Sequence, residues 1–273
     1  MRRTLLCALF ALVLAAPARA DEPVASLGDP TGVDAYAGRL VWSERVAGTE
    51  RFRLMTREGP VPVAERGGPF DVDLGPGGAA VYSRAGRLFR FDFATGQERA
   101  LGLRGRLPAV WRGRLAFVRG GRLLVGRPGA FRAVRGGRGA FEQIDLRGGR
   151  VAFVRSRRGG DRTEYQLLTG RGGHAARLVD REASGLLSSV AIRKPRLLDG
   201  AVVYALSRYG AAGNRFRRVA LPGGREREAV SHQGILAAAF DRGRFLYLRS
   251  SSPPGEGCPE SCPLALSDPV AFR

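Results

Sequence analysis

The sequence is poor in the residues that most enzyme sites use. Its 273 residues include three cysteines, two histidines (His174 and His232), one asparagine (Asn214) and one lysine (Lys194). It also lacks the phosphate-binding Walker loop, the His-Glu-x-x-His zinc motif and the Gly-x-Ser-x-Gly nucleophile elbow. The two histidines are 58 positions apart, and no motif pairs either of them with a nucleophile. These absences argue against catalysis and predict neither a cofactor nor a bound metal.

Long hydrophobic runs are also missing. The longest, Leu5–Ala16, is shorter than the roughly 20 apolar residues that cross a bilayer, so no transmembrane segment is expected. Arg2 and Arg3 precede it, and Ala18-Arg-Ala20 follows it. This pattern predicts a secretory signal peptide over residues 1–20 and a secreted or periplasmic protein. Cys7 lies inside the apolar run rather than at the cleavage point, which argues against lipoprotein attachment.

Acidic residues are scarce relative to arginine. Without residues 1–20 the chain keeps 42 basic and 25 acidic residues, a net charge of +17. Between Leu101 and Gly160 there are 15 arginines against Glu142 and Asp145. Several of these arginines stand at turns beside glycine, namely Arg112, Arg122, Arg138 and Arg158. We expect one positive sector that contacts an acidic protein or an anionic envelope polymer, because arginine binds carboxylate and phosphate through two parallel hydrogen bonds. The alternative is a solvated face that keeps the protein soluble.

A repeated pentapeptide is the main structural signal. It consists of a glycine, two small or aliphatic-tolerant positions, an aliphatic residue and an aromatic residue. The six copies are Gly38–Trp42, Gly78–Tyr82, Gly113–Phe117, Gly149–Phe153, Gly200–Tyr204 and Gly243–Tyr247. Their glycines are 40, 35, 36, 51 and 43 positions apart, a period typical of four-stranded propeller blades. The pattern predicts an all-β, six-bladed β-propeller over residues 21–251, with four antiparallel strands in each blade.

The ends of the propeller and one insertion need separate predictions. The long spacing of 51 places an insertion around Ser184 to Lys194, which we expect to be a loop on one face of the ring. Residues 252–273 form a Pro- and Ser-rich tail. Little chain remains after the third strand expected at Pro263–Ser267, so Pro23–Ser26 is expected to supply the fourth strand of the last blade. Such closure would remove an open sheet edge.

The six pentapeptides resemble the TolB-like, or WD40-like, propeller repeats. Leu74–Gly78 followed by Ala79–Ser83 is similar to the turn and buried strand of that family, and Ala94–Leu101 is similar to its turn and edge strand. The resemblance covers about Val33 to Arg249 and implies the propeller fold. TolB carries an α/β domain before its propeller, whereas the repeats here begin soon after the expected cleavage site. The envelope roles and the lipoprotein partner of TolB are therefore not carried over.

Acidic residues recur just before the buried strands. Asp34, Asp73 and Asp145 belong to expected inner strands, which line the channel of a propeller. They are candidates for binding a cation or the basic group of a ligand. The alternative is that aspartate stabilises turns and strand ends through local hydrogen bonds to the backbone.

Cys258 and Cys262 are the only cysteines after the signal peptide. An oxidising compartment favours a disulfide between them, and a metal site would need two further ligands that nothing nearby supplies. A reactive redox pair is the alternative.

These patterns predict an exported, non-catalytic, monomeric scaffold that binds an acidic protein or an anionic polymer. The competing hypothesis is a six-bladed propeller hydrolase or lactonase with its site in the channel, although the single asparagine argues against a rich metal cage there. An extracellular sensor domain is a third hypothesis, which lacks a membrane span to carry a signal inward. Nucleic acid is not the expected partner, because the export signal opposes what the charge alone suggests.

Overall fold

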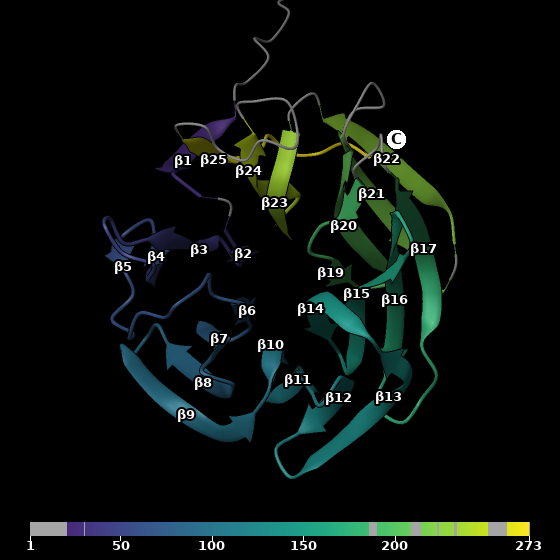
Figure 1. The fold of residues 1–273 in the computed structure, drawn as a ribbon, viewed down its shortest axis with the longest axis horizontal. Helices are drawn as coiled ribbons and strands as arrows, with labels where there is room; N and C mark the ends of the chain where they lie inside the picture. The colour runs from purple at the N-terminus through teal and green to yellow at the C-terminus, as the bar shows by residue number, and fades with distance from the viewer. Residues whose placement is uncertain are drawn as a thin grey trace, which may run out of the picture.

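Six antiparallel sheets form a ring in the computed structural model (Figure 1). The structure describes residues 21–29, 31–185, 190–208, 214–222, 224–231, 234–250 and 261–272. The predicted signal peptide, His232 and Cys258 lie outside these residues. The chain is all-β with six blades, so the predicted six-bladed β-propeller is confirmed. The described residues contain no helix long and apolar enough to cross a membrane.

Four blades are built from four consecutive strands. Blade one contains β2 (Val33–Tyr36), β3 (Arg39–Arg45), β4 (Phe52–Thr56) and β5 (Gly59–Pro60). Blade two contains β6 (Asp73–Gly75), β7 (Ala79–Arg84), β8 (Arg87–Asp92) and β9 (Gln97–Arg104). Blade three contains β10 (Arg106–Trp111), β11 (Arg114–Arg119), β12 (Arg122–Arg127) and β13 (Ala130–Arg138). Blade four contains β14 (Ala140–Arg147), β15 (Arg150–Gly159), β16 (Arg162–Arg171) and β17 (Arg177–Ser184).

The last two blades depart from this plan. In blade five, β18 (Val190–Ile192) and β19 (Arg196–Leu198) both pair with β20 (Ala201–Arg208), which continues to β21 (Asn214–Ala220) and β22 (Glu226–Ser231). Blade six contains β23 (Gly234–Asp241), β24 (Arg244–Ser250) and β25 (Cys262–Leu266), followed in space by β1 (Glu22–Leu27).

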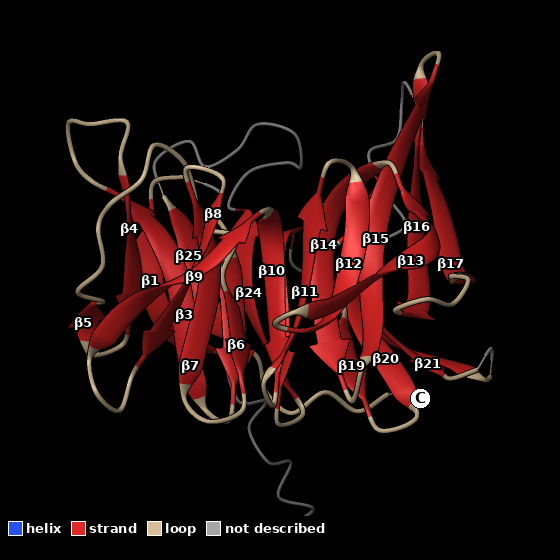
Figure 2. Cartoon of the chain, turned by 90° about the horizontal axis from the view of Figure 1, so that it is seen from below, coloured by secondary structure: helices blue, strands red, loops and turns tan. Residues whose placement is uncertain are grey.

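The glycine of the repeat is required by a tight turn. In blade three, Arg112 has a φ of 44° and Gly113 a φ of 76°, so both residues between β10 and β11 are left-handed. A two-residue hairpin turn of this kind matches the twist of its strands, and glycine adopts the conformation without steric cost. In each blade, the turn between the first and second strands lies on the lower face of the ring as drawn in Figure 2, and so does the turn between the third and fourth strands. The turn between the second and third strands lies on the upper face.

The pentapeptide forms the second strand of each blade, which is buried on both sides. Its aromatic residues are 0–4% exposed, and they are Trp42, Tyr82, Phe117, Phe153, Tyr204 and Tyr247. The hydrophobic core is accordingly divided into clusters that each lie between two neighbouring blades. A strand covered on both sides needs apolar residues at every position, which is why the pentapeptides do not alternate.

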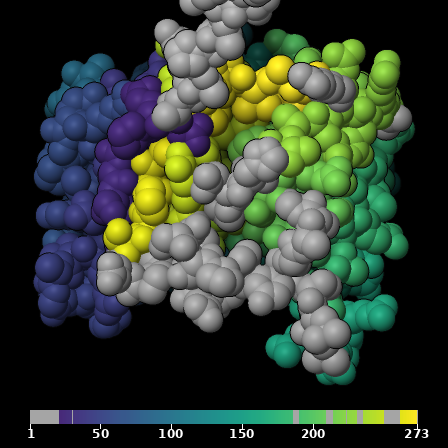
Figure 3. Space-filling view, turned by 90° about the horizontal axis from the view of Figure 1, so that it is seen from above, coloured from purple at the N-terminus to yellow at the C-terminus, as the bar shows by residue number. Residues whose placement is uncertain are grey.

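The N-terminal strand closes the ring, as the sequence predicted. Strand β1 pairs antiparallel with β25, from Glu22 opposite Leu266 to Leu27 opposite Cys262. Figure 3 shows the purple N-terminal strand lying against the yellow C-terminal segment. Part of the expected tail thus supplies the third strand of blade six. Cys262 is completely buried at the start of β25. Because Cys258 lies outside the described residues, the disulfide stays a prediction.

The insertion before blade five is more than the surface loop that we expected. Residues 190–192 form β18, and the side chain of Lys194 is only 11% exposed, between two channel aspartates. That expectation was wrong for its C-terminal part, because the segment turns inward to place a charge in the channel.

Candidate functional site

The inner strands place six equivalent residues around the channel. Each pairs with the third residue after the glycine of its blade, as Asp34 pairs with Val41 and Asp145 with Ala152. In blade order the six are Asp34, Asp73, Ala109, Asp145, Arg196 and Ala239. Blade five therefore carries a cation at the position where blades one, two and four carry an acid.

Each channel aspartate connects its blade to the next one. A carboxylate oxygen of Asp34 accepts the backbone N–H of Leu74, 2.5 Å away in blade two. Asp73 accepts the N–H of Val110 at 2.8 Å, and Asp145 that of Leu197 at 2.6 Å. Hydrogen bonds between an ionised acceptor and a backbone donor are among the stronger ones. These bonds are not the local turn contacts of the alternative reading, because the donor is always in another blade.

The other carboxylate oxygens bind basic side chains of the chain itself. Lys194 Nζ lies 3.1 Å from Asp34 Oδ1 and 3.4 Å from Asp73 Oδ1, and donates to the Val72 carbonyl at 2.9 Å. Arg196 lies 3.0 Å from Asp145 Oδ1. The cation that the sequence led us to expect at these aspartates is thus internal, and it occupies the oxygens that a ligand would use.

One ammonium group is shared by two carboxylates. Burial, together with the nearby Asp34 and Asp145, raises the pKa of Asp73 to about 7 against the opposing effect of Lys194. Although burial opposes it, the two carboxylates raise the pKa of Lys194 above its usual range. Asp73 Oδ1 has no hydrogen-bond partner. Lys194 therefore neutralises one carboxylate, and Asp73 is the group that keeps a proton up to neutral pH.

This arrangement predicts that the protein loses stability as the pH rises from 5 to 8. Asp73 has a pKa near 7 when folded and an ordinary value of 3.8 when unfolded, so the folded state holds the extra proton in this range. The free energy of unfolding then falls with increasing pH. Urea denaturation across this range should show the slope in the parent, and Asp73→Asn should remove it. Asp199→Asn, a control at an exposed carboxylate, should retain the slope; equal slopes in all three proteins would contradict the assignment.

The four arginines singled out from the sequence do not form one patch. Arg122 and Arg138 are cross-strand partners at the upper end of blade three. Arg158 is exposed near the upper end of β15 in blade four. Arg112 lies instead in the lower turn between β10 and β11, 5.7 Å above the Trp111 ring. Blades three and four are thus positive at both ends, and of the four residues only Arg122 and Arg138 are shown to be neighbours.

A cleft on the lower face gathers a different set of arginines. It has a volume of about 380 Å³ and lies between blades three and four. Its described lining residues include no acid, and its basic side chains are Arg114, Arg127, Arg132, Arg171 and His174. None of these arginines forms an ion pair with a described residue. We call this the arginine cleft; unpaired guanidinium groups converging on a concave surface suit an anionic ligand.

The arginine cleft continues past the turn between β16 and β17. A second hollow of about 400 Å³ shares Arg171 and His174 with it and adds Arg150 and Arg177. The turn is fixed to blade three by backbone hydrogen bonds, including Gly173 N–H to the Ala133 carbonyl at 2.9 Å. The basic residues therefore form a track across blades three and four on a rigid support.

Sequence reasoning missed these residues although the signal was present. Arg114, Arg127 and Arg171 each follow a glycine near a turn, as Arg122 does. Strand order places these three arginines and Arg122 on different faces. The first and third turns of a blade lie on the lower face, whereas the second turn, which Arg122 flanks, lies on the upper face. Sorting the arginines by the turn that they flank would have separated the two faces.

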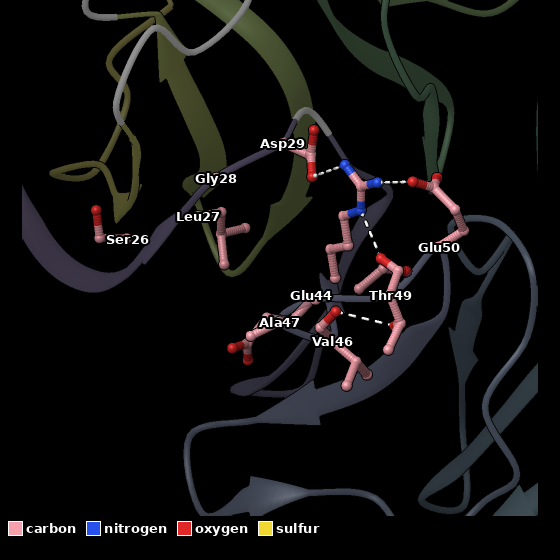
Figure 4. A pocket seen from close by; sticks show the side chains of 12 residues that line it. Ser26, Leu27, Gly28, Asp29, Glu44, Val46, Ala47, Thr49 and Glu50 are labelled. Atoms are coloured by element: carbon pink, nitrogen blue, oxygen red, sulfur yellow. Dashed lines mark hydrogen bonds and ion pairs between the residues drawn. The ribbon is translucent and has the colours of Figure 1, made fainter.

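A further hollow of the described surface carries no unpaired charge. It has a volume of about 440 Å³ and lies between the end of β1 and the turn after β3 (Figure 4). The Arg45 guanidinium inside it is bound to Asp29 at 3.5 Å, to Glu50 and to the Thr49 carbonyl at 2.9 Å. These contacts satisfy its charge, so this hollow is a weaker candidate than the arginine cleft.

Comparison with known proteins adds the fold alone. No protein-family model matches the chain, and no curated protein matches its sequence. An oligogalacturonate lyase in complex with manganese is 15% identical, covering 80% of this chain and 69% of its own, with a TM-score of 0.51. A chain of the mitotic checkpoint complex is 10% identical, covering 97% and 99%, with a TM-score of 0.51. The propeller domain of the Trilobed protease from Pyrococcus furiosus is 10% identical, covering 88% and 98%, with a TM-score of 0.45. A lyase and a chain of a protein complex thus share the fold of this chain.

Proposed function

We propose that this chain is an exported, non-catalytic scaffold with TolB-like repeats whose lower face binds an anionic polymer of the cell envelope or its surroundings. The observation that carries the proposal is the arginine cleft, where four arginines converge without a carboxylate among the described lining residues. Some arginines elsewhere are paired, as Arg217 is with Asp180 and Glu228 at 2.9 and 2.6 Å. What distinguishes the arginine cleft from other arginines without an ion pair is that its guanidinium groups line one concave surface.

A polymer fits the track better than a folded acidic protein does. Protein interfaces depend on buried aromatic and apolar anchors. The exposed large hydrophobic residues of the described surface are Leu178 and Val230, and neither lines the arginine cleft. A chain of carboxylate or phosphate groups needs only the charges, spaced along a track that crosses two blades.

The channel gives less support to the competing hydrolase or lactonase. Such an enzyme would use the channel carboxylates as metal ligands or as acids and bases. Asp34 and Asp145 each bind a backbone N–H with one oxygen and an internal cation with the other. Their hydrogen-bonding capacity is largely used within the fold, which favours a structural role for them.

We expect the mature domain, residues 21–273, to bind immobilised polygalacturonate and polyphosphate, and to be released as the salt concentration rises past about 0.15 M, where the screening length is about 8 Å. Changing Arg114, Arg127, Arg132 and Arg171 together to serine should weaken binding by more than about tenfold. Exposed ion pairs contribute up to about 1 kcal/mol each, and four would be lost.

The control removes the same charge from the opposite face of the same blades. Arg119, Arg122, Arg138 and Arg158 changed together to serine should bind as tightly as the parent, with circular dichroism confirming that both variants fold. Equal losses in the two variants would show that bulk charge alone drives binding and would contradict the proposal. Retention of an acidic protein from an envelope extract, but of neither polymer, would favour a protein partner instead.

A further inference from the structure

The upper mouth of the channel contains a second cavity, separate from the arginine cleft. Its volume is about 320 Å³, and every blade contributes to it where the inner strands begin. About half of its lining is apolar, with the partly exposed Leu107, Leu236 and Ala237 contributing to it. Small-molecule sites are typically apolar cavities of this size or larger that contain a few oriented polar groups.

Arg193 is the unusual polar group of this cavity. It lies between β18 and β19, and its backbone N–H donates to the Ala205 carbonyl at 2.8 Å, which fixes its position on blade five. Its Nε is completely buried without a hydrogen-bond partner, and the side chain forms no ion pair with a described residue. Burial lowers the pKa of Arg193. A buried guanidinium nitrogen without a hydrogen-bond partner is costly, and an anion would remove that cost.

The other charged groups of the mouth are already engaged. Lys194 is bound to Asp34 and Asp73. Asp71 accepts hydrogen bonds from Ser83 and from the Leu107 N–H, and lies 3.1 Å from Arg66. Arg193 therefore forms no ion pair with a described residue, although the Glu142 carboxylate of the same cavity opposes the lowering of its pKa by burial.

Blade four supplies acceptors on the same cavity. Gln143 Oε1 is buried without a hydrogen-bond partner. The neighbouring Glu142 is exposed, and one of its carboxylate oxygens accepts from Ser156 Oγ at 2.5 Å. A ligand that reached both blades would meet a cation on blade five and acceptors on blade four, with apolar walls between them.

The cavity walls are held in place before any ligand arrives. Leu107 has a φ of 50°, a left-handed conformation that is costly for leucine, and its N–H is bound to Asp71 at 2.7 Å. Ser43 Oγ accepts the Phe70 N–H at 2.7 Å, which joins blades one and two. Binding would thus require little reorganisation of these walls, and preformed sites lose less free energy to ordering.

We propose that this cavity binds an apolar α-amino acid. Its carboxylate pairs with Arg193, and its ammonium group donates toward Gln143 and Glu142. Its side chain packs on the apolar part of the lining. This ligand supplies both of the partners that the buried polar atoms lack. A cavity of about 320 Å³ suits a small molecule better than an extended polymer.

Isothermal titration calorimetry of residues 21–273 with L-leucine, L-phenylalanine, L-leucinamide and 4-methylpentanoate tests the proposal. We expect saturable one-to-one binding of at least one of the two amino acids. Leucinamide, which lacks the carboxylate, and 4-methylpentanoate, which lacks the ammonium group, should bind at least about tenfold more weakly. Arg193→Met should weaken amino-acid binding by at least about thirtyfold, the loss typical for one partner of a buried charge pair. The serine variant of the arginine cleft should bind the amino acid unchanged, which separates this site from the lower face.

Thermal melting distinguishes a binding role of Arg193 from a structural one. Because its charge is buried without a partner, Arg193→Met should melt at or above the parent temperature. Arg119→Met, at an exposed arginine, serves as the matched control and should bind like the parent. Absence of amino-acid binding, equal binding of leucinamide, or a melting temperature of Arg193→Met several degrees below the parent would overturn the proposal.

Discussion

Replacing Lys194 with methionine should lower the free energy of unfolding by about 3–5 kcal/mol, the usual cost of removing one partner from a buried ion pair. The ammonium group lies within 3.4 Å of Asp34 Oδ1 and Asp73 Oδ1 and donates to the Val72 carbonyl. The variant would bury both aspartates without their cation. In a domain of this size, we expect the melting temperature to fall by roughly 6–20 °C.

The pH dependence of this loss identifies its cause. At pH 5 the Asp73 carboxyl holds a proton, so the variant should keep more of its stability there; at pH 8, where that carboxyl is ionised, the variant should be least stable. Converting Asp34 and Asp73 to asparagine together with Lys194→Met removes the uncompensated charge, and should restore stability relative to the single variant. Chemical denaturation at both pH values measures the effect. A single variant within about 0.5 kcal/mol of the parent would show that the ion pairs contribute nothing.

The architecture was predictable because one physical constraint repeats along the chain. A strand buried between two blades must be apolar at every position, and the hairpin before it needs a left-handed residue that glycine supplies. Gly113 and its five counterparts therefore mark each blade at a spacing that the sequence displays directly. Closure by residues 22–27 followed from counting strands in the last blade. The register of those strands was not predictable, since it depends on side-chain packing against β25.

The channel was predictable only in part. The sequence showed aspartates in the inner strands, but their partners come from other blades. Leu74, for example, is 40 positions away from Asp34. Lys194 was conspicuous as the only lysine, yet its inward course depends on how the insertion before blade five folds back. Arg193 gave no sequence signal at all, because an arginine in an arginine-rich chain becomes unusual only through burial without a partner.

The distribution of arginines over the two faces of blades three and four was also predictable only in part. The excess of arginine was evident from composition, whereas its division into an upper group around Arg122 and a lower group around Arg132 depends on strand direction. A prediction that follows each hairpin in turn can assign the face. Whether a given guanidinium is unpaired depends on long-range packing, as the pairing of Arg147 with Asp199, 52 positions away, illustrates.

Shortening the chain to residues 29–273 should destabilise the ring more than any single surface substitution. The missing strand β1 carries Leu27, 3% exposed in the core between blades six and one. Its loss would also remove Asp21, which accepts from the Tyr247 hydroxyl and lies 2.5 Å from Arg249. The edge of β25 would then be open, and open edges pair with other molecules.

We therefore expect the shortened chain to melt more than about 5 °C below residues 21–273 and to scatter light at lower temperature. Leu27→Ala tests the same strand without deleting it and should cost about 2–5 kcal/mol, because it leaves a cavity in the core. Ser26→Ala, at the exposed neighbouring position, should stay within about 0.5 kcal/mol of the parent. A synthetic peptide of residues 21–28 added to the shortened chain should raise its melting temperature, because the peptide can re-form the ladder with β25. Unchanged melting of the shortened chain would mean that β1 does not hold the ring closed.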